Sequence, residues 1–195
     1  MLRLRKRMFF VLLVVISPVI AIIVGGGVAS ASTTSTQVVV SSQSSSADPS
    51  TGATHTVQTG VESSAAVPAS VLQAAQAANA SSPLAVSCQT IYASDTDSDV
   101  LGITLAKFQM NTYYCWNDEI VTYHQTWQTN STNLGWSYKG LLDNTFFCYY
   151  ANSNSCSGNY EQMQGNFSGP LSQNFQPTCW LEEVYTGGFS GNCSG

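Results

Sequence analysis

The stretch FQMNTYYCWNDEIVTYHQTW, from Phe108 to Trp127, has the clearest strand pattern in the chain. Two segments of alternating residues flank the polar tripeptide at 117–119. One face of the first segment would carry Phe108, Met110, Thr112, Tyr114 and Trp116. A period of two, rich in aromatic and β-branched residues, predicts a half-buried β-hairpin. The polar break lacks an Asn-Gly or Asp-Gly pair, which favours a connection of three to five residues.

Similar short segments recur along the C-terminal part of the chain, with Asn, Ser and Gly between them. They are expected as strands at about 101–116, 120–128, 135–140, 145–151, 160–167 and 179–186. No segment with a helical period stands out there. Regular short strands with turn-rich breaks predict an all-β domain over residues 84–195. We expect an antiparallel sandwich or barrel of about six to eight strands.

All six cysteines of the chain lie in that domain: Cys88, Cys115, Cys148, Cys156, Cys179 and Cys193. An even number in a short exported domain predicts a disulfide framework. Metal binding is the alternative, but the domain has no Cys-x-x-Cys pair and a single histidine. Six cysteines allow fifteen pairings. Spacing suggests only one of them, Cys148 with Cys156, which would close a polar, turn-rich loop.

Residues 1–31 are typical of a signal peptide. A basic segment, Arg3 to Arg7, precedes an apolar run from Met8 to Val24, and the tripeptide Ala29-Ser30-Ala31 follows. Small residues in an A-x-A pattern predict cleavage after Ala31 and a secreted, extracellular protein. The alternative is a retained membrane anchor, although the run is near the lower length limit for spanning a bilayer and contains Pro18. A membrane would be a partner only in that case.

Residues 32–83 are dominated by Ser, Thr, Ala, Val and Gln and contain no aromatic residue. This composition predicts a disordered linker, because little apolar surface could offset the entropy of ordering. The segment 70–80 favours a short helix, with Ser70 as its N-cap. The alternative is that this segment is a spacer or pro-segment that docks on the domain.

The charge balance excludes nucleic acid as a partner. Beyond residue 31 the chain has two lysines, no arginine and eleven acidic residues, which is a formal charge of −9. Affinity for a phosphate backbone comes mainly from rows of basic side chains, and residues 32–195 have none. Anionic membrane surfaces are disfavoured for the same reason.

Three short motifs resemble a group of known proteins. They are YCWNDEIVT at 114–122, GWSYKG at 135–140 and QGNF at 164–167. Together they resemble small secreted all-β proteins of soil actinobacteria and similar filamentous bacteria, over residues 84–187. The resemblance implies export and a β fold, and it implies no activity. The chain departs from that group at the turn, where it has Asn-Asp-Glu in place of Asp-Gly.

Alternating aspartates make a weak calcium candidate: Asp95, Asp97 and Asp99. Carboxylates at such spacing could converge on a hard cation. The template then requires glycine at the sixth position and glutamate at the twelfth, where this chain has Val100 and Ala106. We therefore expect a solvated acidic loop. No metal or other cofactor is predicted.

Catalysis would require partners for His124, the only histidine of the domain. A general base needs an orienting carboxylate such as Asp143 or Glu161. Glu182 and Glu183 must point to opposite faces of a strand, although either could pair with Glu161. The simpler expectation is a structural histidine, with the acidic residues on wet turns or sheet faces and no catalytic residue.

Aromatic residues are the strongest candidates for a binding site. The candidates are Trp116, Trp127, Trp136, Tyr138 and Trp180. Flat rings beside Asn and Gln suit sugars and also protein interfaces, although most rings should fill the core. We expect an exported, non-catalytic binding or surface-interaction domain, with carbohydrate or the cell envelope as the first ligand class. The alternatives are a secreted hydrolase that uses acidic residues, and a protein-binding or inhibitor module with a disulfide-pinned loop.

Overall fold

The hairpin predicted from the stretch Phe108–Trp127 is formed by strands β4 (Thr104–Trp116) and β5 (Val121–Thr132). The computed structural model describes residues 39–47, 52–62, 67–82, 84–152 and 155–195, and the predicted signal peptide lies outside them. The two strands are antiparallel, with Tyr114 opposite His124. Asn117 closes the turn, because its side-chain oxygen accepts the backbone N–H groups of Glu119 and Ile120. Such local bonding favours asparagine in turns.

The other strands extend this hairpin into one antiparallel sheet. They are β1 (Val39–Ala47), β2 (Thr54–Glu62), β3 (Ser87–Ser98), β6 (Ser137–Asn152), β7 (Ser155–Ser168), β8 (Asn174–Phe175), β9 (Thr178–Val184) and β10 (Phe189–Ser194). The order is β1-β2-β3-β4-β5-β7-β9-β10, and β6 and β8 also pair with β7. The predicted all-β antiparallel class is therefore confirmed.

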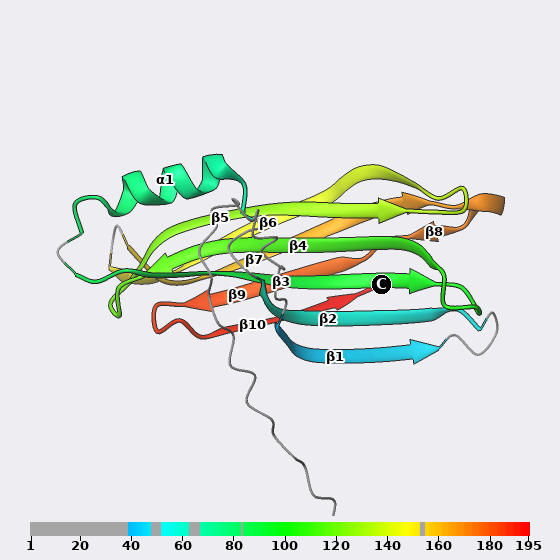
Figure 1. The fold of residues 1–195 in the computed structure, drawn as a ribbon, viewed down its shortest axis with the longest axis horizontal. Helices are drawn as coiled ribbons and strands as arrows, with labels where there is room; N and C mark the ends of the chain where they lie inside the picture. Colours follow the sequence, from blue (N-terminus) through cyan, green and yellow to red (C-terminus); the bar gives the residue numbers. More distant parts are fainter. Residues whose placement is uncertain (1–38, 48–51, 63–66, 83, 153–154) are drawn as a thin grey trace, which may run out of the picture. The chain divides into compact units, whose positions relative to one another are not determined.

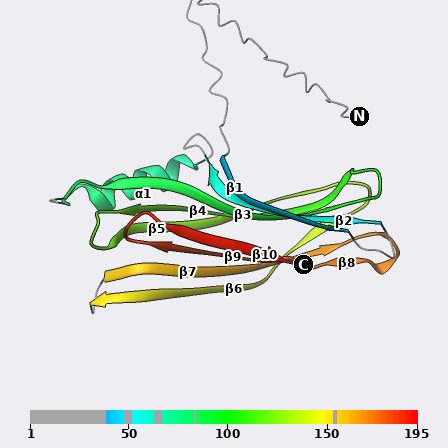
Figure 2. The same cartoon turned by 90° about the horizontal axis from the view of Figure 1, so that it is seen from below.

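The sheet curls over on itself. Strands β5 and β7 pair at a single position, Val121 with Cys156, and beyond it β9 and β10 pack against β2, β3 and β4. Figures 1 and 2 show the result, with β1 to β5 forming a first layer and β6, β7, β9 and β10 forming a second layer. Each layer therefore has an inner face, toward the other layer, and an outer face.

The hydrophobic core lies between the two inner faces. Phe108 of β4 meets Phe167 of β7 edge to face, with ring centroids 6.4 Å apart. Gly165 allows this contact, because a Cβ built there would lie 2.8 Å from the Phe108 ring. The buried core comprises Ile91, Ala93, Ala106, Phe108, Met110, Tyr114, Met163, Phe167, Phe175, Cys179, Leu181 and Cys193. The period-two pattern of β4 is thus the core pattern of the domain.

The structure corrects the expected linker at 32–83, because two of its segments are strands. β2 pairs along its whole length with β3, and β1 pairs with β2. Val57 and Val61 of β2 pack against the core. The β-branched residues of these segments suit a strand, but low complexity and the lack of aromatics concealed this pattern. Their hydrogen bonds depend on β3, which tertiary folding supplies.

The predicted short helix is α1 (Ala69–Asn79), one residue away from the expected bounds. Its N-cap is Pro68 and not Ser70, and no side chain caps it. Ala75 is buried, and the helix contacts β5, so this segment docks on the first layer. A 3-10 turn, η2 (Pro170–Ser172), precedes β8. No helix in the described part of the chain has the length and apolar character to cross a membrane.

Three disulfides confirm the predicted framework, including the pair suggested by spacing. Cys148 is bonded to Cys156, Cys88 to Cys115 and Cys179 to Cys193. The last two bonds join residues that lie directly opposite each other on neighbouring strands. Disulfides persist in oxidising compartments, so the domain is built for such an environment.

Removing the Cys148–Cys156 disulfide is expected to lower the free energy of unfolding by about 2–3 kcal/mol. The bond closes a loop with a sequence separation of 8, and it restricts the unfolded chain at the end of the β6–β7 hairpin. The measurement is urea unfolding of a Cys148→Ser, Cys156→Ser double variant beside the parent protein. A loss below about 1 kcal/mol would contradict the entropic account of this bond.

Candidate functional site

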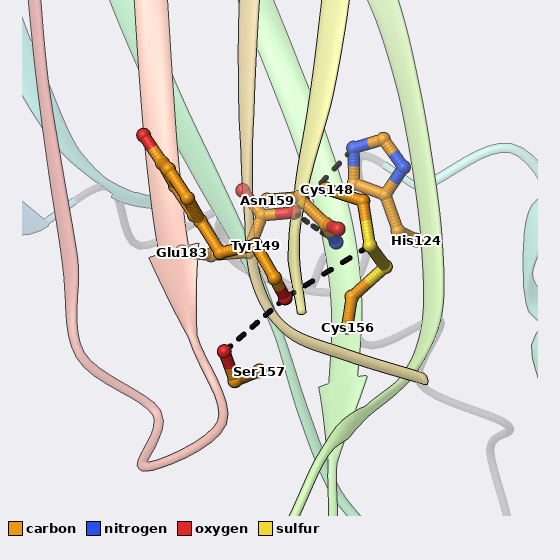
Figure 3. The surroundings of a disulfide bond; sticks show 7 residues. All are labelled: His124, Cys148, Tyr149, Cys156, Ser157, Asn159 and Glu183. Atoms are coloured by element: carbon orange, nitrogen blue, oxygen red, sulfur yellow. Dashed lines mark hydrogen bonds and ion pairs between the residues drawn. A yellow bond between two sulfur atoms is a disulfide. The ribbon is translucent and has the colours of Figure 1, made fainter. Parts of the chain in front are cut away.

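A histidine and two carboxylates from three strands meet between the layers. The Nε2 atom of His124 on β5 lies 3.0 Å from Oε2 of Glu161 on β7 and 3.4 Å from Oε1 of Glu183 on β9. The amide of Asn159 donates a 3.0 Å hydrogen bond to the same Glu183 oxygen. Figure 3 shows the His124 ring and the Asn159 amide turned toward Glu183, beside the Cys148–Cys156 disulfide. We call His124, Asn159, Glu161 and Glu183 the carboxylate cluster.

Strand registers place the cluster. On the inner face, Asn159 lies opposite Glu183 and Glu161 lies opposite Phe146 of β6. His124 is on the inner face of β5, opposite Tyr114. Because inner and outer residues alternate along a strand, Glu182 points to the outer face while its neighbour Glu183 points inward. This confirms the prediction that Glu182 and Glu183 cannot face each other.

Burial governs the ionisation of Glu183. Glu183 is fully buried and Glu161 is 6% exposed. Burial raises the pKa of Glu183 to about 7, and the nearby Glu161 carboxylate also raises it. His124 and the Asn159 amide oppose this change by favouring the charged form. The expectation of acidic residues on wet surfaces is therefore wrong for these two glutamates, because sheet curling brings their faces together.

Hydrogen-bond acceptors outnumber donors in the cluster. The Nε2 atom of His124 carries at most one hydrogen, yet it faces both carboxylates and, at 3.2 Å, the hydroxyl of Thr126. Oε2 of Glu183 and Oδ1 of Asn159 are buried without a hydrogen bond, and Oε2 of Glu161 has only the 3.0 Å contact with Nε2 of His124. Buried acceptors are normally paired in folded proteins. A group that supplies donors would therefore be stabilised here.

A pocket of about 280 Å³ gives access to one side of the cluster. Its polar wall includes His124, Thr126, Asn144 and Glu161, and its apolar wall includes the half-exposed ring of Phe146. The Phe146 and His124 rings are in contact, with centroids 5.1 Å apart. Glu183 is not among the lining residues, so a bound molecule would meet one carboxylate directly.

This geometry limits the chemistry of the cluster. Hydrolysis by paired carboxyls requires both groups to flank a substrate across a cleft. Here the second carboxyl is sealed behind Asn159 and His124. Among the described residues, no group of three or more His, Cys, Asp or Glu side chains could hold a metal ion. The pocket is suited to binding a small polar group.

Two of the three aspartates of the calcium candidate, Asp95 and Asp97, do not lie in a loop as expected. Asp95 and Asp97 are buried in β3, and burial raises the pKa of Asp95 to about 6. The Nε2 atom of His55 lies 3.8 Å from Asp97. Asp99 accepts backbone N–H groups of its own loop, from Leu101 and Ile103. The expectation of a solvated acidic loop is therefore wrong for Asp95 and Asp97, which face inward near the end of β3.

Of the five aromatic candidates, three pack on the core: Trp116, Trp136 and Tyr138. Tyr138 contacts Phe167, with centroids 5.0 Å apart, and Trp116 contacts Tyr114 at 5.1 Å. Trp127 lies on the outer face of the first layer, because its immediate neighbours Thr126 and Gln128 lie opposite inward-facing residues of β4. Only Trp180 lies on the outer face of the second layer.

Trp180 belongs to a row of rings that crosses three neighbouring strands. The Tyr160 ring of β7 stacks on Trp180 of β9, with centroids 5.9 Å apart and planes 24° apart. Phe147 of β6 lies 6.2 Å from Tyr160 on the other side. We call Phe147, Tyr160 and Trp180 the aromatic strip. Phe147 is 57% exposed, and the other two rings are half-buried.

Sequence reasoning missed Phe147 and Tyr160 because the strip depends on strand order. β7 lies between β6 and β9, so residues far apart in the chain become neighbours. The available signal was the alternation of residues in 158–162 and 178–182, which places Tyr160 and Trp180 each on the polar face of its strand. That alternation cannot reveal which strands pair.

No protein-family model matches the chain, and no curated protein or solved structure matches it. The resemblance to small secreted bacterial proteins therefore stays a prediction.

Proposed function

We propose that the protein is an exported, non-catalytic binding domain that holds carbohydrate on the aromatic strip. The observation that supports this best is the continuous contact of three rings, Phe147, Tyr160 and Trp180, on an open sheet face. Apolar faces of sugar rings pack on aromatic side chains, while nearby polar groups take their hydroxyls. Export by a signal peptide cleaved after Ala31 is part of the proposal, and the three disulfides support it.

Polar groups flank the strip on the same outer face. The Tyr160 hydroxyl donates a 2.9 Å hydrogen bond to the side-chain oxygen of Gln162, which leaves the Gln162 amide hydrogens for a ligand. Glu182 lies opposite Tyr160, and the exposed Asn192 lies opposite Trp180. The strip thus combines stacking surfaces with donors and acceptors, as sugar recognition requires.

Binding is better supported than the alternative of a secreted hydrolase. His124 does lie beside a carboxylate at a pocket, as a hydrolase would require. However, the second carboxylate, Glu183, is fully buried and cannot reach a substrate. No comparable obstacle applies to the aromatic strip, which is open to solvent at Phe147.

The expected result of Trp180→Ala is a loss of at least about tenfold in affinity for glycan, equivalent to about 1.4 kcal/mol. The physical reason is the loss of the ring on which Tyr160 stacks. The measurement is retention on cellulose, chitin and peptidoglycan, followed by titration with soluble oligosaccharides of whichever is bound. Phe147→Ala is expected to act in the same direction.

Trp127→Ala is the matched control, since it removes the same side chain from the outer face of the other layer. It is expected to leave glycan binding unchanged. Failure of the parent protein to bind any of these polymers, or an equal loss in Trp127→Ala, would reject the strip as the site.

A further inference from the structure

We infer that the pocket beside the carboxylate cluster is a second binding site, which takes a primary ammonium group. This site is separate from the aromatic strip of the proposed function. The pocket opens on the inner face of β6 and β7, and the strip lies on their outer face. The ligand class follows from three observations: the balance of hydrogen-bond donors and acceptors, the balance of charge, and the aromatic wall.

Glu161 supplies the acceptor that a ligand would meet. Glu161 is only 6% exposed, and it lines the pocket. Its Oε2 atom is buried, and its one partner is Nε2 of His124, 3.0 Å away. Two further acceptors of the same cluster, Oδ1 of Asn159 and Oε2 of Glu183, are also buried without a hydrogen bond. An ammonium group has three donors and no acceptor, so it matches this imbalance.

The charges of the cluster also favour a cation. Two carboxylates share one imidazole, and neither lysine of residues 32–195 acts on Glu183. Lys107 interacts with Glu62 instead, and Lys139 is exposed toward the other end of β6. A buried carboxylate is stable when it is paired and costly when it is not. A ligand cation would therefore add a second charge partner to Glu161, whose Oε2 atom has only the imidazole of His124 beside it.

Phe146 provides the third element. Its ring is half exposed, forms one wall of the pocket and lies in register with Glu161 on the adjacent strand. A cation over an aromatic face gains about 0.5–2 kcal/mol. The amide of Asn144 adds another acceptor at the wall. A volume of about 280 Å³ admits an alkylammonium chain of a few carbons. Lysine side chains and amino sugars both carry this group.

The first test uses n-butylammonium chloride as the probe and the disulfide-intact full chain labelled at the methionine methyl groups. Met163 lines the pocket, so its methyl resonance reports occupancy. We expect a saturable shift with a dissociation constant on the order of millimolar. The neutral analogue n-butanol and sodium chloride at equal ionic strength should give no saturable shift. An equal response to n-butanol would overturn the proposal.

Glu161→Gln keeps the shape of the side chain and removes its charge. It is expected to weaken n-butylammonium binding at least about tenfold, while Glu119→Gln, in the exposed β4–β5 turn, leaves it unchanged. Unchanged affinity in Glu161→Gln would overturn the proposal. If that variant does not fold, Phe146→Leu replaces it, and a loss of about threefold or more is expected because the aromatic face is absent.

Two further probes distinguish the sources of the ammonium group. Nα-acetyl-lysine amide is compared with Nα-acetyl-norleucine amide, and glucosamine is compared with glucose. Preference for either ammonium compound over its neutral partner supports the site and identifies its natural source. Absence of both preferences overturns it as a ligand site.

Discussion

Replacement of His124 by alanine is expected to lower the free energy of unfolding by about 3–5 kcal/mol at pH 8. Nε2 of His124 lies 3.0 Å from Glu161 and 3.4 Å from Glu183, and both glutamates are buried. Without the imidazole, the two carboxylates lie close together, and only the Asn159 amide and a backbone N–H remain as partners of Glu183. Urea unfolding of the variant beside the parent protein measures the loss.

The loss should depend on pH because Glu183 titrates in the folded protein. Burial raises its pKa from 4.5 to about 7, so the folded state holds a proton that the unfolded state releases. The parent protein's free energy of unfolding should therefore decrease as the pH rises from 4.5 to 7, and Glu183 alone should account for roughly 3 kcal/mol of this decrease. Removing His124 also removes the attraction that lowers this pKa. The variant should consequently lose less stability at pH 5, where Glu183 carries its proton.

His55→Ala provides a matched control for the same substitution. The side chain of His55 is 33% exposed and lies 3.8 Å from Asp97, so its removal should cost less than that of His124. Adding Glu183→Gln to His124→Ala should recover part of the stability at pH 8, because one unpaired buried charge is removed. Equal losses in the two histidine variants would show that the carboxylate cluster does not depend on His124.

Phe108→Ala is expected to cost about 3–5 kcal/mol, the usual range for deleting a buried phenylalanine ring. Phe108 is fully buried at the centre of the core, meets Phe167 edge to face and lies against the backbone at Gly165. The surrounding residues belong to paired strands of both layers, so they can close the resulting cavity only in part. Thermal and urea unfolding at pH 6 measure the loss.

The control for this prediction is Phe147→Ala, which removes the same ring from an exposed outer face. It should cost about 1 kcal/mol or less. Similar losses in both phenylalanine variants would mean that the core does not lie between the layers where Phe108 and Phe167 meet.

Much of the fold could be predicted from local pattern, and the misses have a common cause. The alternation in 108–127 identified β4 and β5, and the short spacing of Cys148 and Cys156 identified their disulfide, because both are properties of neighbouring residues. Strands β1 and β2 were missed because Ser- and Thr-rich segments lack the apolar residues that make a strand recognisable. They are stabilised by pairing with β3, which contributes from a distant part of the chain.

The candidate sites, like the fold, were predictable only where neighbouring residues define them. His124 was recognised as a lone histidine that needed a carboxylate, and Glu161 was one of two named partners. Glu183 was named only as a possible partner of Glu161 from a neighbouring strand, and its full burial beside His124 could not be predicted. The aromatic strip was foreseen only at Trp180, because Phe147 and Tyr160 become its neighbours through the order of β6, β7 and β9.

The β class of the domain, its disulfides and its lack of a basic surface could all be predicted, because each segment carries its own composition and period-two alternation. Tertiary structure decided which side chains meet. A strand's alternation says only that its residues take opposite faces, and the curling of the sheet then turned one set of faces inward. That step buried Glu161 and Glu183 beside His124 and left the Phe147, Tyr160 and Trp180 rings together on the outside.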